Sequence, residues 1–172
     1  MSEATRSKAT RSKATRAKAT RATQALDRAG IAYSVHTYAY DPEAPRIGLQ
    51  AAEALGVAPG DILKTLMAEV DGRPVCVLLA SDREVALKRL ASAQGGKAAA
   101  MLKPAEAERI TGYHVSGISP LGQKRRLPVL IDADSIQGRD AIYLNGGGRG
   151  LQVRLAPADL VTVLEARVVP LT

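Results

Sequence analysis

Lys64 is the residue whose surroundings most clearly suggest chemistry. Residues 63–70 alternate in the manner of a strand, and this period of two places Lys64 on one face with Leu66 and Ala68. An ammonium group among apolar neighbours is costly to bury. The side chain therefore either lies at the mouth of a pocket that takes an anion or reaches water from the strand end, and the residues alone leave both interpretations open. Thr65 projects to the opposite face and is structural unless the strand bends there.

A second candidate is the segment 116–122, which reads Ser-Gly-Ile-Ser-Pro-Leu-Gly. Gly117 and Gly122 allow unusual backbone angles and Pro120 stiffens the chain, which is typical of a loop. Such a loop can direct consecutive N–H groups into a cavity, as an oxyanion hole does, although its composition alone favours a plain structural loop. It lacks the second glycine of G-x-S-x-G and is not a nucleophile elbow.

Two further clusters are rich in charge or in glycine. Lys124, Arg125 and Arg126 form a basic run that suits phosphate groups, or that simply faces solvent. Residues 146–150, four glycines and one arginine, precede residues 151–155, which alternate like a strand, whereas a phosphate-binding loop precedes a helix. We therefore interpret the glycine cluster as a turn between two strands.

Other reactive residue types are few. His36 and His114 have no nucleophile with an acidic partner in their sequence context, and Cys76 lies in an apolar run and is predicted to be a core thiol. A single cysteine excludes an internal disulfide, and one Cys with two His is too few for a Cys/His zinc site. We expect neither a metal nor a cofactor.

Glycine and proline divide the sequence into short elements. The patterns predict helices over residues 23–29, 50–55, 87–93, 104–111 and 157–165, and strands over residues 31–40, 63–70, 74–80, 127–132, 141–145 and 151–155. The dipeptide Asp71-Gly72 predicts a tight hairpin between two of these strands. Hairpins mixed with short helices indicate an α+β fold.

The 172 residues, of which 46% are hydrophobic, suit one ordinary domain. Its positive charge lies mainly in residues 1–21, which hold seven Lys or Arg against one Glu, whereas the rest of the chain holds 17 basic and 16 acidic residues. Residues 1–21 also repeat the pentapeptide Ala-Thr-Arg-Ser-Lys, a period that forms no apolar face. We expect a disordered basic tail over residues 1–21 and a folded domain over residues 22–172.

The tail has two interpretations that stay open: a tether for RNA phosphates, or an extension that only aids solubility. The sequence contains no apolar run of about 20 residues that could span a bilayer, and no secretory signal. We therefore expect a cytoplasmic protein that does not contact membranes.

Residues 116–128, preceded by Thr111-Gly112-Tyr113, resemble the signature loop of the YbaK-type Cys-tRNA(Pro) deacylases, which are related to the editing domain of bacterial prolyl-tRNA synthetases. Shorter motifs recur in the same order across about residues 23–169: His36-Thr37-Tyr38, Asp41-Pro42, Leu55-Gly56, Lys64-Thr65-Leu66, Ile142-Tyr143, Gly146-Gly147 and Arg149-Gly150-Leu151. The resemblance implies an α+β domain whose mixed, mostly antiparallel sheet curls into a barrel-like pocket with flanking helices.

The resemblance also implies roles for individual residues. Lys64 matches a lysine that contacts the 3′-terminal nucleotide of tRNA, and Gly117 matches a glycine that places the scissile ester, so both are expected to be catalytic. The expected substrate-binding residues are Tyr38, Ile47, Thr65, Ser116, Ile118, Ser119, Pro120, Asn145 and Gln152, and the expected RNA-binding residues are Lys124, Arg125 and Arg126.

The resemblance implies a trans-editing aminoacyl-tRNA deacylase that removes cysteine from Cys-tRNA(Pro). No protein nucleophile is apparent, so the substrate thiol would attack the ester while Lys64 holds the ribose-phosphate end and the Gly117 and Ile118 amides orient the carbonyl. Expected partners are tRNA(Pro), tRNA(Cys) and prolyl-tRNA synthetase. An Ala-tRNA(Pro)-type deacylase and a non-catalytic module that binds tRNA or a synthetase are the alternatives.

Four pocket positions depart from the family pattern. Ile47 replaces a phenylalanine of the Cys-specific members, and Ser116 replaces a glycine. Asn145 and Gln152 replace a serine and an aspartate. The last change removes a negative charge, so a contact with the amino group of the substrate would weaken, and specificity for cysteine follows less directly than deacylation.

Overall fold

The computed structural model describes residues 19–172, so residues 1–18 of the predicted tail lie outside the described part of the chain. The α-helices are α2 (Arg21–Arg28), α3 (Gln50–Leu55), α4 (Leu87–Ala93), α5 (Pro104–Thr111), α6 (Ala133–Ile136) and α7 (Pro157–Leu164), with short 3-10 turns η1 (Ile47–Leu49) and η2 (Pro59–Asp61). The strands are β1 (Ser34–Thr37), β2 (Ile62–Val70), β3 (Arg73–Ala80), β4 (Ala99–Met101), β5 (Val129–Asp132), β6 (Ile142–Asn145), β7 (Leu151–Leu155) and β8 (Arg167–Val169).

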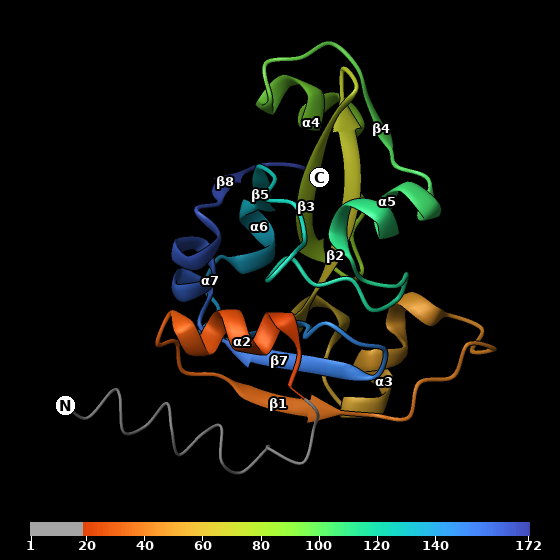
Figure 1. Cartoon of the computed structure of the whole chain (residues 1–172), viewed down its shortest axis with the longest axis vertical. Helices are drawn as coiled ribbons and strands as arrows, with labels where there is room; N and C mark the ends of the chain where they lie inside the picture. The colour runs from red at the N-terminus through yellow and green to blue at the C-terminus, as the bar shows by residue number, and fades with distance from the viewer. Residues whose placement is uncertain (1–18) are drawn as a thin grey trace.

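The strands build one open sheet of eight strands in the order β1-β7-β6-β2-β3-β5-β8, with β4 paired to β2 outside this path (Figure 1). Four pairings are antiparallel and three are parallel. The predicted α+β fold with a mixed, mostly antiparallel sheet is confirmed. The barrel-like closure is wrong, because a barrel requires its first and last strands to pair, and β1 and β8 are separate edges here.

The β2–β3 hairpin is the longest pairing of the sheet. Its turn residues Asp71 and Gly72 have φ angles of 50° and 80°, as expected for a tight turn in which both central residues are left-handed. The register runs from Val70 opposite Arg73 to Leu63 opposite Ala80. The hairpin predicted from the sequence is confirmed.

The other edge of β2 is shared between two strands. Ile62 and Leu63 pair with β6 in parallel, whereas residues 68–70 pair with β4 in the antiparallel sense. Residues 64–67 lie between these two pairings; Met67 O accepts a hydrogen bond from Leu102 N at 3.0 Å, and the described strands give residues 64–66 no partner on this edge. The sheet is therefore split along the middle of β2.

The two faces of the sheet pack into different cores. Helices α2, α5 and α7 cover one face, where Leu26, Ala107 and Leu160 belong to the larger buried cluster. Helix α4 covers the hairpin on the other face through Leu90, and α3 packs against Ile62 in a third, small cluster. In Figure 1, α2 lies alongside β7, while α4 lies at the far end of the hairpin. The site described below lies on the α3 side of the sheet.

Helix α2 begins at Arg21, two residues earlier than the pattern predicts. Thr20 is its N-cap: Thr20 Oγ1 accepts a hydrogen bond from Thr23 N at 3.1 Å, and Thr23 Oγ1 accepts one from Thr20 N at 2.9 Å. Thr20 Oγ1 also lies 2.5 Å from the carbonyl oxygen of Gly146 and donates to it. The last residues of the predicted tail are thus attached to the glycine turn.

The positions of glycine and proline correctly predicted where most of the other helices and strands begin and end. Helices α3, α4 and α5 and strand β7 have the predicted bounds, and Gly56 and Gly112 end α3 and α5 with φ angles of 69° and 79°. Strand β1 covers only residues 34–37 of the predicted 31–40. Strands β4 and β8 and helix α6 were not predicted, since three or four residues are too few to show a period.

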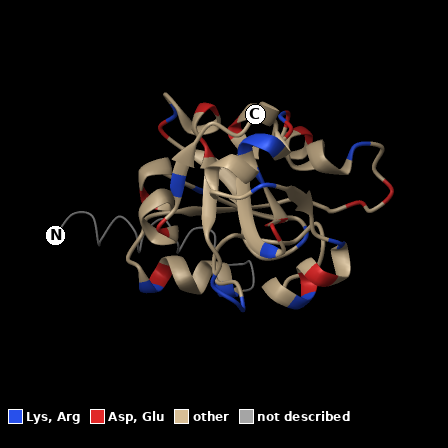
Figure 2. Ribbon diagram, turned by 90° about the horizontal axis from the view of Figure 1, so that it is seen from above, with Lys and Arg blue, Asp and Glu red and all other residues tan. Residues whose placement is uncertain are grey.

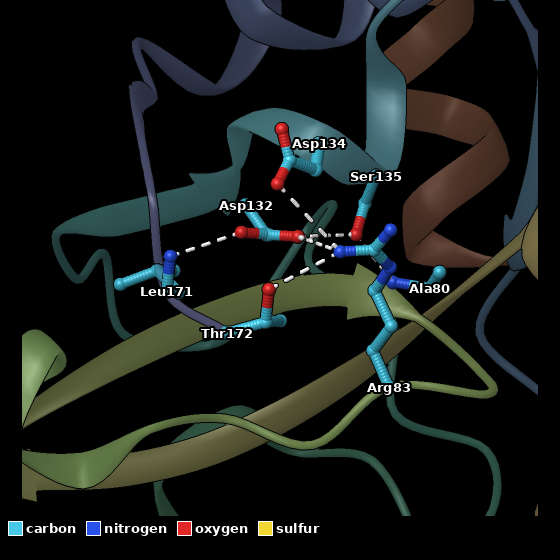
Figure 3. Close-up of polar contacts among 7 residues, drawn as sticks. All are labelled: Ala80, Arg83, Asp132, Asp134, Ser135, Leu171 and Thr172. Carbon is cyan, nitrogen blue, oxygen red and sulfur yellow. Dashed lines mark hydrogen bonds and ion pairs between the residues drawn. The ribbon is translucent and has the colours of Figure 1, made fainter.

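A buried carboxylate ties the end of the chain to the sheet (Figure 3). Asp132 is fully buried at the end of β5, where its Oδ1 accepts from Leu171 N at 2.9 Å and its Oδ2 accepts from Ser135 Oγ at 2.7 Å. Ser135 Oγ in turn accepts from Ala80 N at 2.9 Å, and Arg83 Nη1 lies 4.0 Å from Asp132 Oδ2. This network joins β3, β5, α6 and the C-terminal segment.

Charge is dispersed over the folded part of the chain. Basic and acidic segments alternate around the described ribbon and do not gather on one face (Figure 2). No helix within residues 19–172 is long and apolar enough to cross a membrane.

Asp132→Ala is expected to lower the free energy of unfolding by about 3 kcal/mol, because it leaves buried donors without their acceptor. Denaturant unfolding monitored by circular dichroism measures the change. Asp134→Ala is the matched control, since this carboxylate, two residues later on α6, is exposed and its loss is expected to cost less than about 0.5 kcal/mol. Equal losses in the two variants would contradict the anchoring role of Asp132.

Candidate functional site

A cavity of about 210 Å³ opens where the sheet is split. It is bounded by β2, β6, β7, the segment 38–51 and the loop after α5. Eight residues expected from the sequence line it together: Tyr38, Ile47, Lys64, Thr65, Ser116, Ile118, Asn145 and Gln152. Residues more than 100 positions apart in the chain are thus brought to one cavity.

Six other expected site residues do not line this cavity. Gly117 is buried behind the wall that its neighbours form, and Ser119 and Pro120 are buried as well. Ser119 is directed into the core of the loop, where its Oγ accepts from Leu121 N at 3.2 Å. The remaining three are the exposed residues Lys124, Arg125 and Arg126, of which Arg126 forms an ion pair with Glu165 at 2.6 Å.

Lys64 lies at the split, just after the two residues of β2 that pair with β6. Its ammonium group makes no ion pair or hydrogen bond within residues 19–172, and the lining of the cavity contains no Asp or Glu. A cation that lines a cavity without a carboxylate is a ready site for an anion. The pocket interpretation of Lys64 therefore fits the structure better than a side chain that merely reaches solvent.

Thr65 lines the same cavity although strand alternation places it opposite Lys64. The missing partner strand at residues 64–66 explains this, because the cavity reaches both sides of an unpaired edge. Thr65 Oγ1 is buried without a hydrogen bond, and so is Gln152 Oε1 from β7. Two lining residues thus each contain a buried polar atom without a hydrogen-bond partner within residues 19–172.

The loop 116–122 packs against the glycine turn 146–150. A Cβ atom on Gly117 would lie 3.1 Å from the backbone of Gly148 and Arg149, which is tighter than an ordinary contact, so a side chain here would push the two segments apart. Ser116, directly before it, has a φ angle of 69°, a conformation that favours glycine. The backbone therefore constrains which residue types fit at positions 116 and 117.

Asn145 holds this contact together. Its Oδ1 accepts from Gly147 N at 2.7 Å and Gly148 N at 3.1 Å. Its Nδ2 donates to Gly148 O at 3.0 Å and to Ser116 O at 3.4 Å. The side chain is thus fully used by the backbone of the turn and the loop, so it positions the wall of the cavity and has little capacity left for a ligand.

The amide groups of the loop are not equivalent. Gly117 N donates to the carbonyl oxygen of His114 at 2.8 Å, so this N–H is already engaged. Ile118, which lines the cavity, makes no backbone N–H hydrogen bond to any described residue. Ser116 also lines the cavity, and its N–H likewise makes no hydrogen bond to a described residue, so if the loop stabilises an oxyanion the amides of Ser116 and Ile118 are the available donors.

Tyr38 closes the cavity near the glycine turn. Its backbone N donates to Gly150 O at 3.0 Å, and a Cβ atom on Gly150 would lie 2.4 Å from the Tyr38 carbonyl oxygen. Burial raises the pKa of Tyr38, and the nearby Tyr40 raises it further. Its hydroxyl therefore stays protonated at neutral pH. Ile47 is 40% exposed at the rim.

The two histidines and the cysteine lie outside the lining of the cavity. His36 packs edge-on against Tyr143, and burial together with Arg154 lowers its pKa, while His114 is exposed. Burial raises the pKa of Cys76 to about 12, as expected for a core thiol. Within residues 19–172 no three His, Cys, Asp or Glu side chains come together to hold a metal ion.

Sequence reasoning missed several lining residues, among them Tyr40, Gly48, Ala51, Ser81 and Val115. Ala51 is on the helix α3, and Ser81 directly follows β3 and donates to Ile62 O at 2.9 Å. Only their place in the fold brings them to the cavity. For Tyr40 and Val115 the sequence offered one indication, because they lie within two residues of the motif residues Tyr38 and Ser116.

Comparison with known proteins gives one family. The profile of the aminoacyl-tRNA editing domain matches residues 41–163. The chain is 35% identical over 122 residues to EbsC of Enterococcus faecalis, named as a Cys-tRNA(Pro)/Cys-tRNA(Cys) deacylase, covering 70% of this chain and 74% of EbsC. It is 30% identical over 122 residues to the multifunctional Ser/Thr-tRNA deacylase ProXp-y of Escherichia coli K12, covering 69% and 73%.

The structure points in the same direction. A crystal structure described as that of a trans-editing enzyme for prolyl-tRNA synthetase superposes with a TM-score of 0.77 and 25% identity, covering 88% of this chain and 94% of the other. Part of the chain is also 32% identical over 83 residues to the proline–tRNA ligase of Acidithiobacillus ferrooxidans, of which it covers 15%.

Gly117→Ala is expected to lower the free energy of unfolding by about 2 kcal/mol, since the added methyl group meets backbone that cannot move aside cheaply. Ser116→Gly is the matched control at the neighbouring position. It is expected to raise stability by up to about 1 kcal/mol, because glycine adopts the positive φ angle without strain. Thermal and urea unfolding of both variants measure these changes, and destabilisation by Ser116→Gly would refute the strain at this residue.

Proposed function

We propose, from the premise that this chain belongs to the aminoacyl-tRNA editing domain family, that it is a trans-editing deacylase that cleaves the ester of mischarged tRNA. The observation that carries the proposal is the unpaired Lys64 in a cavity without a carboxylate. The 3′ end of a charged tRNA brings an anionic backbone next to the aminoacyl ester. A cation of this kind can therefore hold the nucleic acid end while the ester enters the cavity.

The amino acid that we propose as the substrate is cysteine, attached to tRNA(Pro). EbsC is named for this activity, and a cavity of about 210 Å³ suits a small amino acid. ProXp-y is named for serine and threonine, which are also small. Because Ile47 and Gln152 differ from the Cys-specific pattern, a panel of Cys-, Ser- and Ala-charged tRNA(Pro) is the appropriate set of substrates.

Ester cleavage at this site does not require a nucleophile from the protein. The lining contains no His, Cys, Asp or Glu to activate a hydroxyl. In the proposed reaction the substrate sulfur bonds to the carbonyl carbon, the ester C–O bond breaks, and the ribose oxygen leaves with the proton that the thiol gave up. Water then opens the resulting thiolactone to free cysteine. The Ser116 and Ile118 amides are the proposed donors to the oxyanion.

Partners follow from this reaction. We propose that tRNA(Pro), and tRNA(Cys) as a second substrate, bind with the acceptor end at the cavity, and that prolyl-tRNA synthetase supplies the mischarged tRNA. Such an enzyme acts in the cytoplasm, where translation takes place. Lys124, Arg125 and Arg126 do not line the cavity and are proposed to contact phosphates farther along the tRNA.

Lys64→Ala is expected to lower kcat/KM for deacylation of Cys-tRNA(Pro) about 100-fold, because the anionic end of the substrate loses its only cationic partner in the cavity. Release of labelled cysteine in single-turnover assays measures the rate. Lys88→Ala on helix α4 is the matched control and is expected to retain wild-type activity. Unchanged deacylation in Lys64→Ala would exclude this role of Lys64. A wild-type protein that binds tRNA but deacylates none of the charged tRNAs would favour the non-catalytic module.

Removal of residues 1–18 is expected to weaken tRNA binding and its dependence on salt. These residues carry six Lys or Arg and one Glu. Each phosphate contact that is lost reduces the slope of log K against log salt by about 0.7 to 0.9. Filter binding at several salt concentrations measures the slope. A tail with Lys and Arg replaced by Gln separates charge from length, and equal slopes for the full and truncated chains would show that the tail only aids solubility.

A further inference from the structure

Arg149 is a cation beside the cavity whose side chain is held in place by two contacts. Its Nε donates to Val115 O at 2.9 Å, and its guanidinium carbon lies 5.5 Å from the centre of the Tyr40 ring. Val115 and Tyr40 both line the cavity, whereas Arg149 is exposed and lies outside the lining. The two contacts therefore fix an exposed guanidinium group at the rim of the cavity.

The backbone on either side of Arg149 is fixed as well. Gly148 N donates to Asn145 Oδ1 at 3.1 Å, and Gly148 O accepts from Asn145 Nδ2 at 3.0 Å. On the other side, Gly150 O accepts from Tyr38 N at 3.0 Å. A side chain that is already ordered loses little conformational entropy when it binds a ligand, so Arg149 is preorganised for binding.

Most of the hydrogen-bonding capacity of Arg149 is unused. A guanidinium group carries N–H donors on Nε, Nη1 and Nη2, and within residues 19–172 only Nε makes a hydrogen bond. Arg149 forms no ion pair with any described carboxylate. Glu108, which also contacts Val115, accepts from Val115 N at 2.8 Å and lies 3.6 Å from His114 Nδ1. The free Nη groups match the paired oxygens of a phosphate.

We propose that Arg149 binds the second phosphodiester from the 3′ end of tRNA, while Lys64 binds the last one. This inference rests on the proposed deacylase function and adds the path of the RNA out of the site. Lys64 lines the cavity that receives the ester, and Arg149 lies outside this lining in contact with two of its residues. A strand that leaves the cavity past Tyr40 and Val115 therefore brings its next phosphate to the guanidinium group.

RNA with a single neutral linkage tests this without relying on turnover. The probe is a hairpin RNA with the acceptor stem and single-stranded 3′ end of tRNA(Pro) and no amino acid. In a second RNA a methylphosphonate replaces the second phosphodiester from the 3′ end, and fluorescence anisotropy with the full-length wild-type chain is expected to show about tenfold weaker binding. A methylphosphonate in the hairpin loop, far from the 3′ end, is the control and is expected to change the affinity less than about twofold.

Three variants assign the effect to Arg149. Arg149→Gln is expected to weaken binding of the unmodified RNA about tenfold and to leave the affinity for the methylphosphonate RNA unchanged. It is also expected to reduce the slope of log K against log salt by about 0.7, the value for one phosphate of a single strand. Arg149→Lys keeps the charge and is expected to keep this slope. Arg89→Gln, exposed on α4, is the matched control and is expected to bind both RNAs as the wild type does.

The outcomes separate a phosphate contact from a structural role. If Arg149→Gln weakens both RNAs equally, Arg149 only holds the loop against the glycine turn, and the inference is overturned. Equal affinity of the wild type for the unmodified and methylphosphonate RNAs also overturns it, as does the absence of RNA binding. Circular dichroism shows whether each variant folds, and the wild-type affinities decide whether this phosphate is bound even if Arg149→Gln does not fold.

The same measurements separate this inference from the function on which it rests. A wild-type protein that deacylates no charged tRNA, but still discriminates the two RNAs through Arg149, would remove the proposed catalytic function and leave the RNA contact standing. Normal deacylation without this discrimination would remove the contact and leave the function standing.

Discussion

The contact between the loop 116–122 and the glycine turn 146–150 is the constraint on which the site depends. Neither segment belongs to a helix or a strand, so nothing in the sheet fixes their distance. Asn145 makes three hydrogen bonds to the backbone of the turn and one, at 3.4 Å, to Ser116 O in the loop, and Gly117 allows the two backbones to approach. Thr20 holds the turn from the other side. The cavity wall is therefore rigid because its own polar groups are satisfied by each other.

A second constraint comes from the sheet. Since β6 and β4 share one edge of β2 without meeting, residues 64–66 lie along a gap that a regular sheet would not contain. This gap gives Lys64 and Thr65 access to the same cavity despite their opposite directions.

Local sequence patterns predicted most helices and strands, whereas the geometry of the site depends on contacts between segments that are distant in the sequence. The Asp71-Gly72 turn and the helices ended by Gly56 and Gly112 follow from backbone preferences that a few residues express. Strands β4 and β8 owe their structure to their neighbours and show no pattern of their own. The resemblance to a family located Asn145, yet its use by the backbone of the turn depends on where Ser116 lies, which no sequence pattern encodes.

The polar groups of the cavity divide into those that the protein uses and those that it leaves open. Asn145 in the lining, and Gly117 N and Ser119 behind it, are occupied by internal hydrogen bonds and shape the site. Lys64, Thr65 Oγ1 and Gln152 Oε1 have no partner within residues 19–172. Leaving these groups unpaired costs stability, and a ligand that supplies an anion removes that cost for Lys64. The selectivity of the site therefore depends on which polar groups of the lining residues remain unsatisfied after folding.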